Sequence, residues 1–245
     1  MLAYVRLEIL RQLRNRQALL FRIALPAAMF VLFRTLLVED KPSAGLPPDA
    51  DAMVVFAVFG ALFSGLFASG PPLATERAIG WLRQLRVTPL PPGSAVAGKV
   101  AAAMAFALPS VALVLIAAAV TQGIRFGMDQ WAVLLALLWL AAAPFVALGV
   151  LIGLAVTDPE SAQSAASLSL ILLWVLGGMV TEPSDLPAVF ETLAHGLPTN
   201  GAAELGWASV REDAMPGSAI AVVGAWTAGT AALTTLAWHR LAGPR

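Results

Sequence analysis

The sequence predicts an all-α membrane protein with six membrane-spanning helices. Of its 245 residues, 59% are hydrophobic and only 12% are charged, and the mean hydropathy is +0.80. A soluble domain has an apolar share of about 45–50%, so a soluble domain does not account for this composition. The second observation is the length of the apolar stretches, because a helix needs about 20 apolar residues to cross about 30 Å of hydrocarbon.

Six apolar stretches reach this length and predict a single membrane domain over residues 1–245. An interfacial helix occupies residues 1–16, the bundle of spans occupies residues 17–238, and a cytoplasmic tail occupies residues 239–245. The six predicted spans are residues 17–38, 52–70, 95–120, 131–156, 162–181 and 217–238.

Small residues and prolines interrupt these spans. We expect kinks at Pro26, Pro109 and Pro144, where neighbouring helices can bond the freed carbonyl groups. Gly149 and Gly153 match the spacing of small residues that lets membrane helices approach closely, which weakly indicates a helix interface there.

Residues 1–16 predict a basic amphipathic helix along the inner membrane surface. Leu2, Val5, Ile9 and Leu13 recur at helical spacing, and the arginines fall largely on the other faces. Such a helix can serve as a positively charged anchor or as a contact for a partner protein, and the sequence leaves both open.

The placement of charge predicts the orientation. With the N-terminus in the cytoplasm, 11 of the 15 cationic residues and only 4 of the 15 acidic residues lie on the cytoplasmic side. Short cytoplasmic loops of membrane proteins carry an excess of Lys and Arg. We therefore expect both termini in the cytoplasm.

The long outer segment, residues 182–216, predicts two short helices that dip into or lie on the outer leaflet. Apolar residues from position 186 to position 197 keep helical spacing, with Ser184 or Asp185 as the N-cap and Pro187 in the first turn. A second apolar segment restarts at Asn200-Gly201 and runs through Trp207. This segment is interpreted either as a cap over an outward-opening pathway or as a lid that only packs.

The side chains that most enzyme sites need are missing. The chain has no cysteine and only two histidines, His195 and His239, which the predicted topology places on opposite sides of the membrane. The sequence also lacks the Gly-x-x-x-x-Gly-Lys-Ser/Thr phosphate-binding loop, so the chain is not itself such an ATPase. We expect no catalytic residue, no metal and no cofactor bound by this chain. A net charge of zero gives no indication of nucleic-acid binding.

The predicted cytoplasmic loop of residues 76–99 is the one large polar surface between two apolar spans. It predicts a short helix that begins at Glu76 and ends before Pro89, with Trp81 and Leu85 as an apolar ridge. A short rigid helix held between two spans can transmit a displacement into both. The alternative is a solvated, positively charged loop.

Two motifs in this loop carry a family resemblance. Glu-Arg-x-x-Gly at residues 76–80 and Gln-Leu-x-Val-Thr-Pro-Leu at residues 84–90, followed by Lys99, resemble the loop between the second and third spans of ABC-2-type transporter permeases. The basic N-terminus, the six spans and Leu197-Pro198 in the outer segment are similar to the same family. The resemblance covers the whole chain.

The resemblance implies a membrane subunit of an ATP-driven exporter in the bacterial inner (plasma) membrane. A separate cytoplasmic ABC subunit would bind ATP and Mg, and two permease chains would pair as a homodimer or a heterodimer within membrane lipid. The loop helix would be a coupling helix that rests on the ATP-binding subunit. The candidate coupling residues are Glu76, Arg77, Gly80, Arg83, Gln84 and Thr88.

The second and fifth predicted spans supply the candidate substrate pathway. An apolar, aromatic pathway favours a hydrophobic or amphipathic cargo such as a drug, an antibiotic or a lipid. The candidate pathway residues are Phe56, Phe59, Phe63, Leu168, Leu172 and Trp174.

Other functional classes fit the sequence less well. The chain could be an integral membrane signalling or scaffold subunit, which would need no ATPase. A lipid-modifying or proteolytic enzyme is disfavoured by the missing catalytic side chains. A heme-exporting permease has a similar size, but His195 with Trp207 falls short of the His and Trp pattern expected for it.

Overall fold

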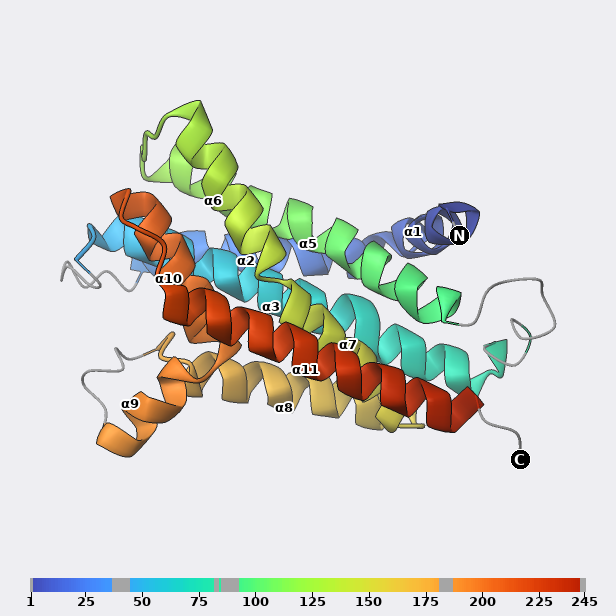
Figure 1. The fold of residues 1–245 in the computed structure, drawn as a ribbon. Helices are drawn as coiled ribbons and strands as arrows, with labels where there is room; N and C mark the ends of the chain where they lie inside the picture. The colour runs from blue at the N-terminus through green and yellow to red at the C-terminus, as the bar shows by residue number, and fades with distance from the viewer. Residues whose placement is uncertain (1, 37–44, 82–83, 85–92, 181–186, 243–245) are drawn as a thin grey trace.

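The computed structural model describes residues 2–36, 45–81, 84, 93–180 and 187–242. Within these ranges the chain forms helices and short connections without a β-strand (Figure 1), which confirms the all-α prediction. The helices are α1 Leu2–Arg14, α2 Arg16–Leu36, α3 Pro48–Ala78, α5 Ser94–Thr121, α6 Met128–Leu140, α7 Ala143–Ala155, α8 Pro159–Leu176, α9 Ala188–His195, α10 Pro198–Arg211 and α11 Gly217–Ala242.

Five helical segments in the described ranges are long and apolar enough to cross a membrane, which makes the chain a multi-pass membrane protein. They correspond to five of the six predicted spans. The exception is α8, the helix of the predicted fifth span, whose 18 residues end at Leu176. Its first half carries Glu160, Gln163 and several serines, which lower its apolar character. The five segments are Arg16–Leu36, Pro48–Ala78, Val96–Thr121, Met128–Ala155 and Gly217–Trp238.

The start of α8 is fixed by a side-chain cap. The Asp158 carboxylate accepts a hydrogen bond from the Ser161 backbone N–H at 2.7 Å, as an N-cap residue does. Because this bond favours the ionised form, the pKa of Asp158 lies below its ordinary value.

Helix α3 is the central helix of the bundle. It has 31 residues, which corresponds to a length of about 46 Å. Most of it is buried, and it packs against α2, α5, α7, α8 and α10. Figure 1 shows the long helices running along one common direction, with both termini at the same end of the bundle.

The course of α3 corrects one expectation. The sequence predicted a span that ends at Gly70 and a separate helix that begins at Glu76, whereas α3 continues through Pro71 and Pro72 to Ala78. Pro72 cannot donate to the carbonyl of Ala68 four residues earlier. The Gln12 side chain of α1 donates to that carbonyl instead, at 3.3 Å, so a neighbouring helix supplies the missing donor.

A second proline is accommodated in a similar way. Pro26 lies inside α2 and frees the carbonyl of Arg22. The Ser110 hydroxyl of α5 lies 3.2 Å from that oxygen and 3.2 Å from the Gly60 carbonyl oxygen of α3, so its one proton is shared between them. Pro144 instead begins α7 after a break at residues 141–142 in the fourth predicted span, as the sequence indicated.

Glycines bring α3 and α7 into close contact. A Cβ added to Gly149 would lie 2.9 Å from the Leu66 carbonyl oxygen, and one added to Gly153 would lie 2.6 Å from the Gly70 carbonyl oxygen. The small-residue spacing at positions 149 and 153 therefore marks a helix interface within this chain.

The outer segment contains the two short helices that the sequence predicted, α9 and α10. Pro187 is the N-cap of α9, while Ser184 and Asp185 lie outside the described residues. The Thr199 hydroxyl at the start of α10 donates to the Leu173 carbonyl of α8 at 2.7 Å, and the Asn200 amide donates to the Gly177 carbonyl at 3.4 Å. The N-terminal turn of α10 thus bonds the carbonyl groups at the end of α8.

Replacing Gly153 by alanine should destabilise the protein by about 1–3 kcal/mol, because the added methyl forces α3 and α7 apart. The measurement is the melting temperature of the purified protein in detergent. The matched control is Gly224→Ala in α11, where an added Cβ meets nothing within 4 Å, and it should leave the melting temperature unchanged or slightly raised. An unchanged melting temperature for Gly153→Ala would contradict the assigned packing.

Candidate functional site

A buried group of charges joins three helices at the end of the bundle that holds the termini. The Lys99 ammonium of α5 donates to the Glu8 carboxylate of α1, and it donates to Glu76 Oε1 of α3 at 2.7 Å. Exposed fractions are 1% for Glu8, 3% for Glu76 and 1% for Lys99. Charges removed from water persist only when they are paired and hydrogen-bonded, so these contacts fix the three helices to one another.

Arg11 extends this group of charges towards solvent. Its Nη1 donates to Glu76 Oε1 at 2.8 Å and lies 3.9 Å from Glu8 Oε2. Its guanidinium also lies 5.5 Å from the ring centroid of Trp81, within range of a cation–π contact. We call Glu8, Arg11, Glu76 and Lys99 the charge cluster. Through the contact between Arg11 and Trp81, the charge cluster also connects α1 to the chain that follows α3.

Arg77 makes a separate connection. Its Nη1 lies 3.0 Å from the Gly153 carbonyl oxygen and 3.2 Å from that of Val156, and it also donates to Leu154. These carbonyl groups belong to the last turn of α7 and its C-cap, which have no helical partner of their own. A cation at this position also interacts favourably with the helix dipole. The end of α3 is therefore fixed to α7 as well as to α1 and α5.

The chain turns sharply after α3. Gly80 has φ +77°, in the left-handed region that glycine adopts without strain, and its N–H donates to the Arg77 carbonyl at 3.0 Å. Beyond this turn, the Gln84 N–H donates to the Gly80 carbonyl at 3.3 Å. Gln84 is exposed.

The predicted coupling residues therefore fall into three groups. Glu76 and Arg77 face inward and hold α3 in place, rather than starting a separate helix. Gly80 and Gln84 form the turn that follows. Arg83 and Thr88 lie outside the described residues.

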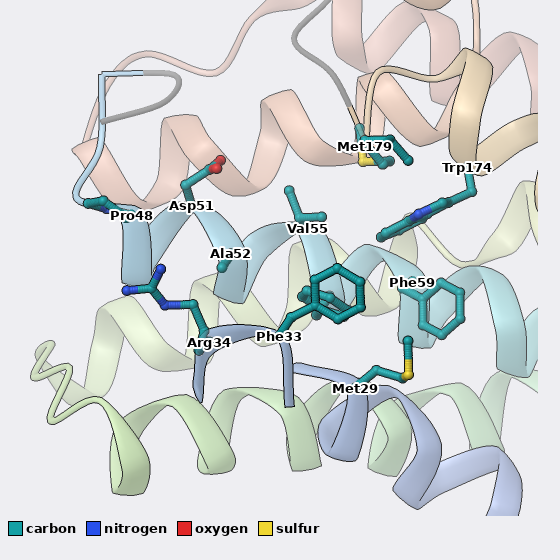
Figure 2. A pocket seen from close by; sticks show the side chains of 12 residues that line it. Met29, Phe33, Arg34, Pro48, Asp51, Ala52, Val55, Phe59, Trp174 and Met179 are labelled. Atoms are coloured by element: carbon teal, nitrogen blue, oxygen red, sulfur yellow. The ribbon is translucent and has the colours of Figure 1, made fainter. Parts of the chain in front are cut away.

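A pocket of about 390 Å³ lies towards the other end of the bundle, between α2, the first half of α3 and the end of α8 (Figure 2). Trp174 packs edge-on against Phe59, with ring centroids 4.8 Å apart, and its ring lies 6.1 Å from that of Phe56. The twelve residues that line the pocket are Met29, Phe33, Arg34, Pro48, Asp51, Ala52, Val55, Phe56, Phe59, Trp174, Met179 and Val180.

This aromatic pocket is polar on one side. Figure 2 shows Arg34 and Asp51 away from the Trp174 and Phe59 rings, which lie on the opposite side. Arg34 forms an ion pair with Asp49, while its buried Nε has no hydrogen-bond partner among the described residues. The pocket can therefore hold a molecule with an apolar body and a polar end.

The comparisons with known proteins identify the family. Residues 1–205 match the model of the family described as "ABC-2 type transporter". This chain belongs to that family. It is 26% identical over 206 residues to a protein of Bacillus subtilis (strain 168) named "Putative transport permease YvfS", and the match covers 83% of this chain and 82% of the relative. Family membership implies a transport permease that works with an ATP-binding subunit.

The structure divides the predicted pathway residues of this permease. Phe56, Phe59 and Trp174 line the aromatic pocket, and Phe63 stacks on Phe59 with centroids 5.8 Å apart without lining it. The two leucines, Leu168 and Leu172, are not among its lining residues, and their exposed fractions are 59% and 47%.

The charge cluster was not predicted from the sequence. Lys99 was placed only after the loop motif, and Glu8 was given no role. Both carry a signal, since Lys99 is the one charged residue in helix 94–121 and Glu8 is the one acid in residues 1–16. An isolated charge of this kind does not show which residue of another helix will pair with it.

Replacing Lys99 by methionine should cost about 3–5 kcal/mol of stability, because Glu8 is then a buried carboxylate without a cation in hydrogen-bond contact. Adding Glu8→Gln to this variant should restore part of the loss, since Arg11 still pairs with Glu76. Melting temperature and yield of the monodisperse protein in detergent measure both effects. Arg14→Met, on an exposed position of α1, is the control. A Lys99→Met protein as stable as the control would contradict the charge cluster.

Proposed function

We propose that this chain is the membrane subunit of an ATP-driven exporter that moves a hydrophobic or amphipathic compound out of the cytoplasm or the inner leaflet. A separate ABC subunit would supply ATP hydrolysis. The observation that carries the cargo proposal is the aromatic pocket with its polar side. Aromatic rings favour contact with apolar and planar groups, and the guanidinium of Arg34 favours a hydrogen-bond acceptor.

Helix α3 supports the proposed coupling between the two ends of the molecule. Its last turn carries Glu76 and Arg77, and its first half carries Phe56 and Phe59 of the aromatic pocket. The turn at Gly80 joins this helix to Trp81, and Gln84, a little further along the chain, is exposed. A displacement of that turn by an ATP-binding subunit would move α3 and therefore the wall of the pocket. In this proposal Glu76 and Arg77 transmit the movement to α1, α5 and α7 without touching the partner.

The membrane topology completes the proposal. Helix α8 has 18 residues, about 27 Å, so together with residues 177–180 that follow it, it is long enough to be a sixth crossing. Both termini at one end of the bundle agree with an even number of crossings. The excess of cations at that end supports a cytoplasmic location in a bacterial inner membrane. Two such chains, identical or different, would pair with two ATP-binding subunits.

Replacing Trp174 by alanine should weaken the response of the complex to its cargo. The test uses the permease reconstituted with its ATP-binding subunit in liposomes, and it measures how amphipathic fluorescent compounds stimulate ATP hydrolysis. We expect the half-maximal concentration to rise about tenfold, because one wall of the pocket loses its aromatic surface.

Phe190→Ala is the matched control for this experiment. Phe190 is an aromatic residue of α9 with 46% of its surface exposed, and it does not line the pocket. Stimulation by hydrophilic solutes alone would overturn the proposed cargo class. An equal loss in both variants would overturn the role of the aromatic pocket.

A further inference from the structure

A second pocket, of about 350 Å³, lies at the end of the bundle that holds the termini. It opens between α1, the beginning of α2 and the last two turns of α3, next to the charge cluster. Unlike the aromatic pocket, it is lined mainly by polar and charged side chains. The lining residues are Glu8, Arg11, Gln12, Asn15, Arg22, Pro71, Pro72, Thr75, Glu76, Ile79 and Lys99.

The charges that line this polar pocket do not balance. Three cations, Arg11, Arg22 and Lys99, face two carboxylates, Glu8 and Glu76. Lys99 and Arg11 each form ion pairs with both carboxylates. With all five groups ionised, the pocket has a net charge of +1.

Arg22 carries the excess charge. Its side chain is partly buried, and the hydrogen bond found for it in the described residues runs from Nη1 to Gln12 Oε1, at 3.2 Å. It forms no ion pair with any described carboxylate. A guanidinium has five donors in a planar arrangement that suits phosphate and carboxylate oxygens. A cation inside a membrane helix is costly without a counter-ion, so an anion bound in this pocket would stabilise Arg22.

The surroundings indicate which molecule supplies that anion. Arg22 lies six residues after the start of α2, close to the membrane interface in the proposed topology. Ile79 lines the pocket and is 65% exposed, and Leu13 and Phe21, the chain neighbours of Gln12 and Arg22, are 42% and 58% exposed. A phosphate bound here would thus lie beside apolar surface at headgroup depth. That combination fits a lipid better than a free ion.

We propose that the polar pocket binds the phosphate group of an anionic phospholipid, with Arg22 as its main donor. The Asn15 side-chain carbonyl accepts from the Ala18 N–H, which leaves its amide as a further donor. A zwitterionic headgroup would bring an ammonium group towards Arg11 and Lys99, so a headgroup with net charge −1 matches the pocket better. The site is independent of the cargo pathway, because the aromatic pocket shares no lining residue with it.

The test measures binding of short-chain lipids to the delipidated chain in detergent. Melting temperature is followed while dihexanoyl phosphatidylglycerol, dihexanoyl phosphatidylcholine or inorganic phosphate is added at equal ionic strength. Of the three compounds, phosphatidylglycerol should raise the melting temperature of the wild-type chain at the lowest concentration. Inorganic phosphate should not change the melting temperature at the concentrations at which phosphatidylglycerol acts. Stabilisation by phosphate at the same concentration, or an equal response to phosphatidylcholine, would overturn the lipid assignment.

Two variants make the test specific to Arg22. Arg22→Gln should weaken binding of phosphatidylglycerol about tenfold, since a charge-assisted hydrogen bond is lost. Gln12→Glu keeps Arg22 but places a carboxylate at its Nη1, so it should weaken binding to a similar extent. Gln12→Glu also removes the side-chain donor to the Ala68 carbonyl, which lowers the melting temperature before any lipid is added. For each variant, the quantity compared is therefore the rise in melting temperature that the lipid causes.

The matched control adds the same charge outside the pocket. Gln17→Glu, at an exposed position near the start of α2, should bind phosphatidylglycerol within about twofold of the wild type, because a solvent-exposed charge outside the pocket is screened. Equal binding by Arg22→Gln and wild type would overturn the proposal, and so would equal losses in Gln12→Glu and Gln17→Glu.

Discussion

The ammonium group of Lys99 is the contact on which one end of this permease depends. It lies between Glu8 and Glu76 and so joins α1, α3 and α5, and all three side chains are buried. Separating any of the three helices would leave a buried charge unpaired, at a cost that exceeds the gain from most single contacts. Helix α1 is therefore fixed to α3 and α5 rather than loosely attached to the bundle.

The cost of leaving a backbone carbonyl without a donor away from water explains the shape of the central helix. α3 continues through Pro71 and Pro72 because Gln12 bonds the freed Ala68 carbonyl, and its final turn is held because Arg77 bonds the end of α7. These contacts make α3 one continuous helix that reaches from the charge cluster to the aromatic pocket. In the proposed function, this continuity lets a movement at one end of α3 reach the other.

Hydrophobic pattern predicted most of the architecture, because span length and apolar spacing are local properties of the sequence. The two outer helices were predicted in this way from residues 182–216. Contacts between residues far apart in the sequence were not predictable. The Gln12 side chain replaces the N–H that Pro72 lacks, and Lys99 pairs with Glu8, 91 residues earlier in the chain. On α8, the sequence could not separate Trp174, which enters the pocket, from Leu168, which faces away, because the neighbouring helices determine which face is buried.

The most direct test of the account is a cross-link from the turn that follows α3. The chain has no cysteine, so Gln84→Cys carries a single reactive thiol at an exposed position. In native membranes, a maleimide–benzophenone reagent is attached to this thiol, and on illumination its benzophenone inserts into a nearby C–H bond. It should join residue 84 to a soluble subunit with a phosphate-binding loop and ATPase activity. Met128→Cys changes the first residue of α6, which is 84% exposed, and α6 begins at the opposite end of the bundle, so this variant should give no such product. No adduct at residue 84, or the same adduct from both positions, would contradict coupling through α3.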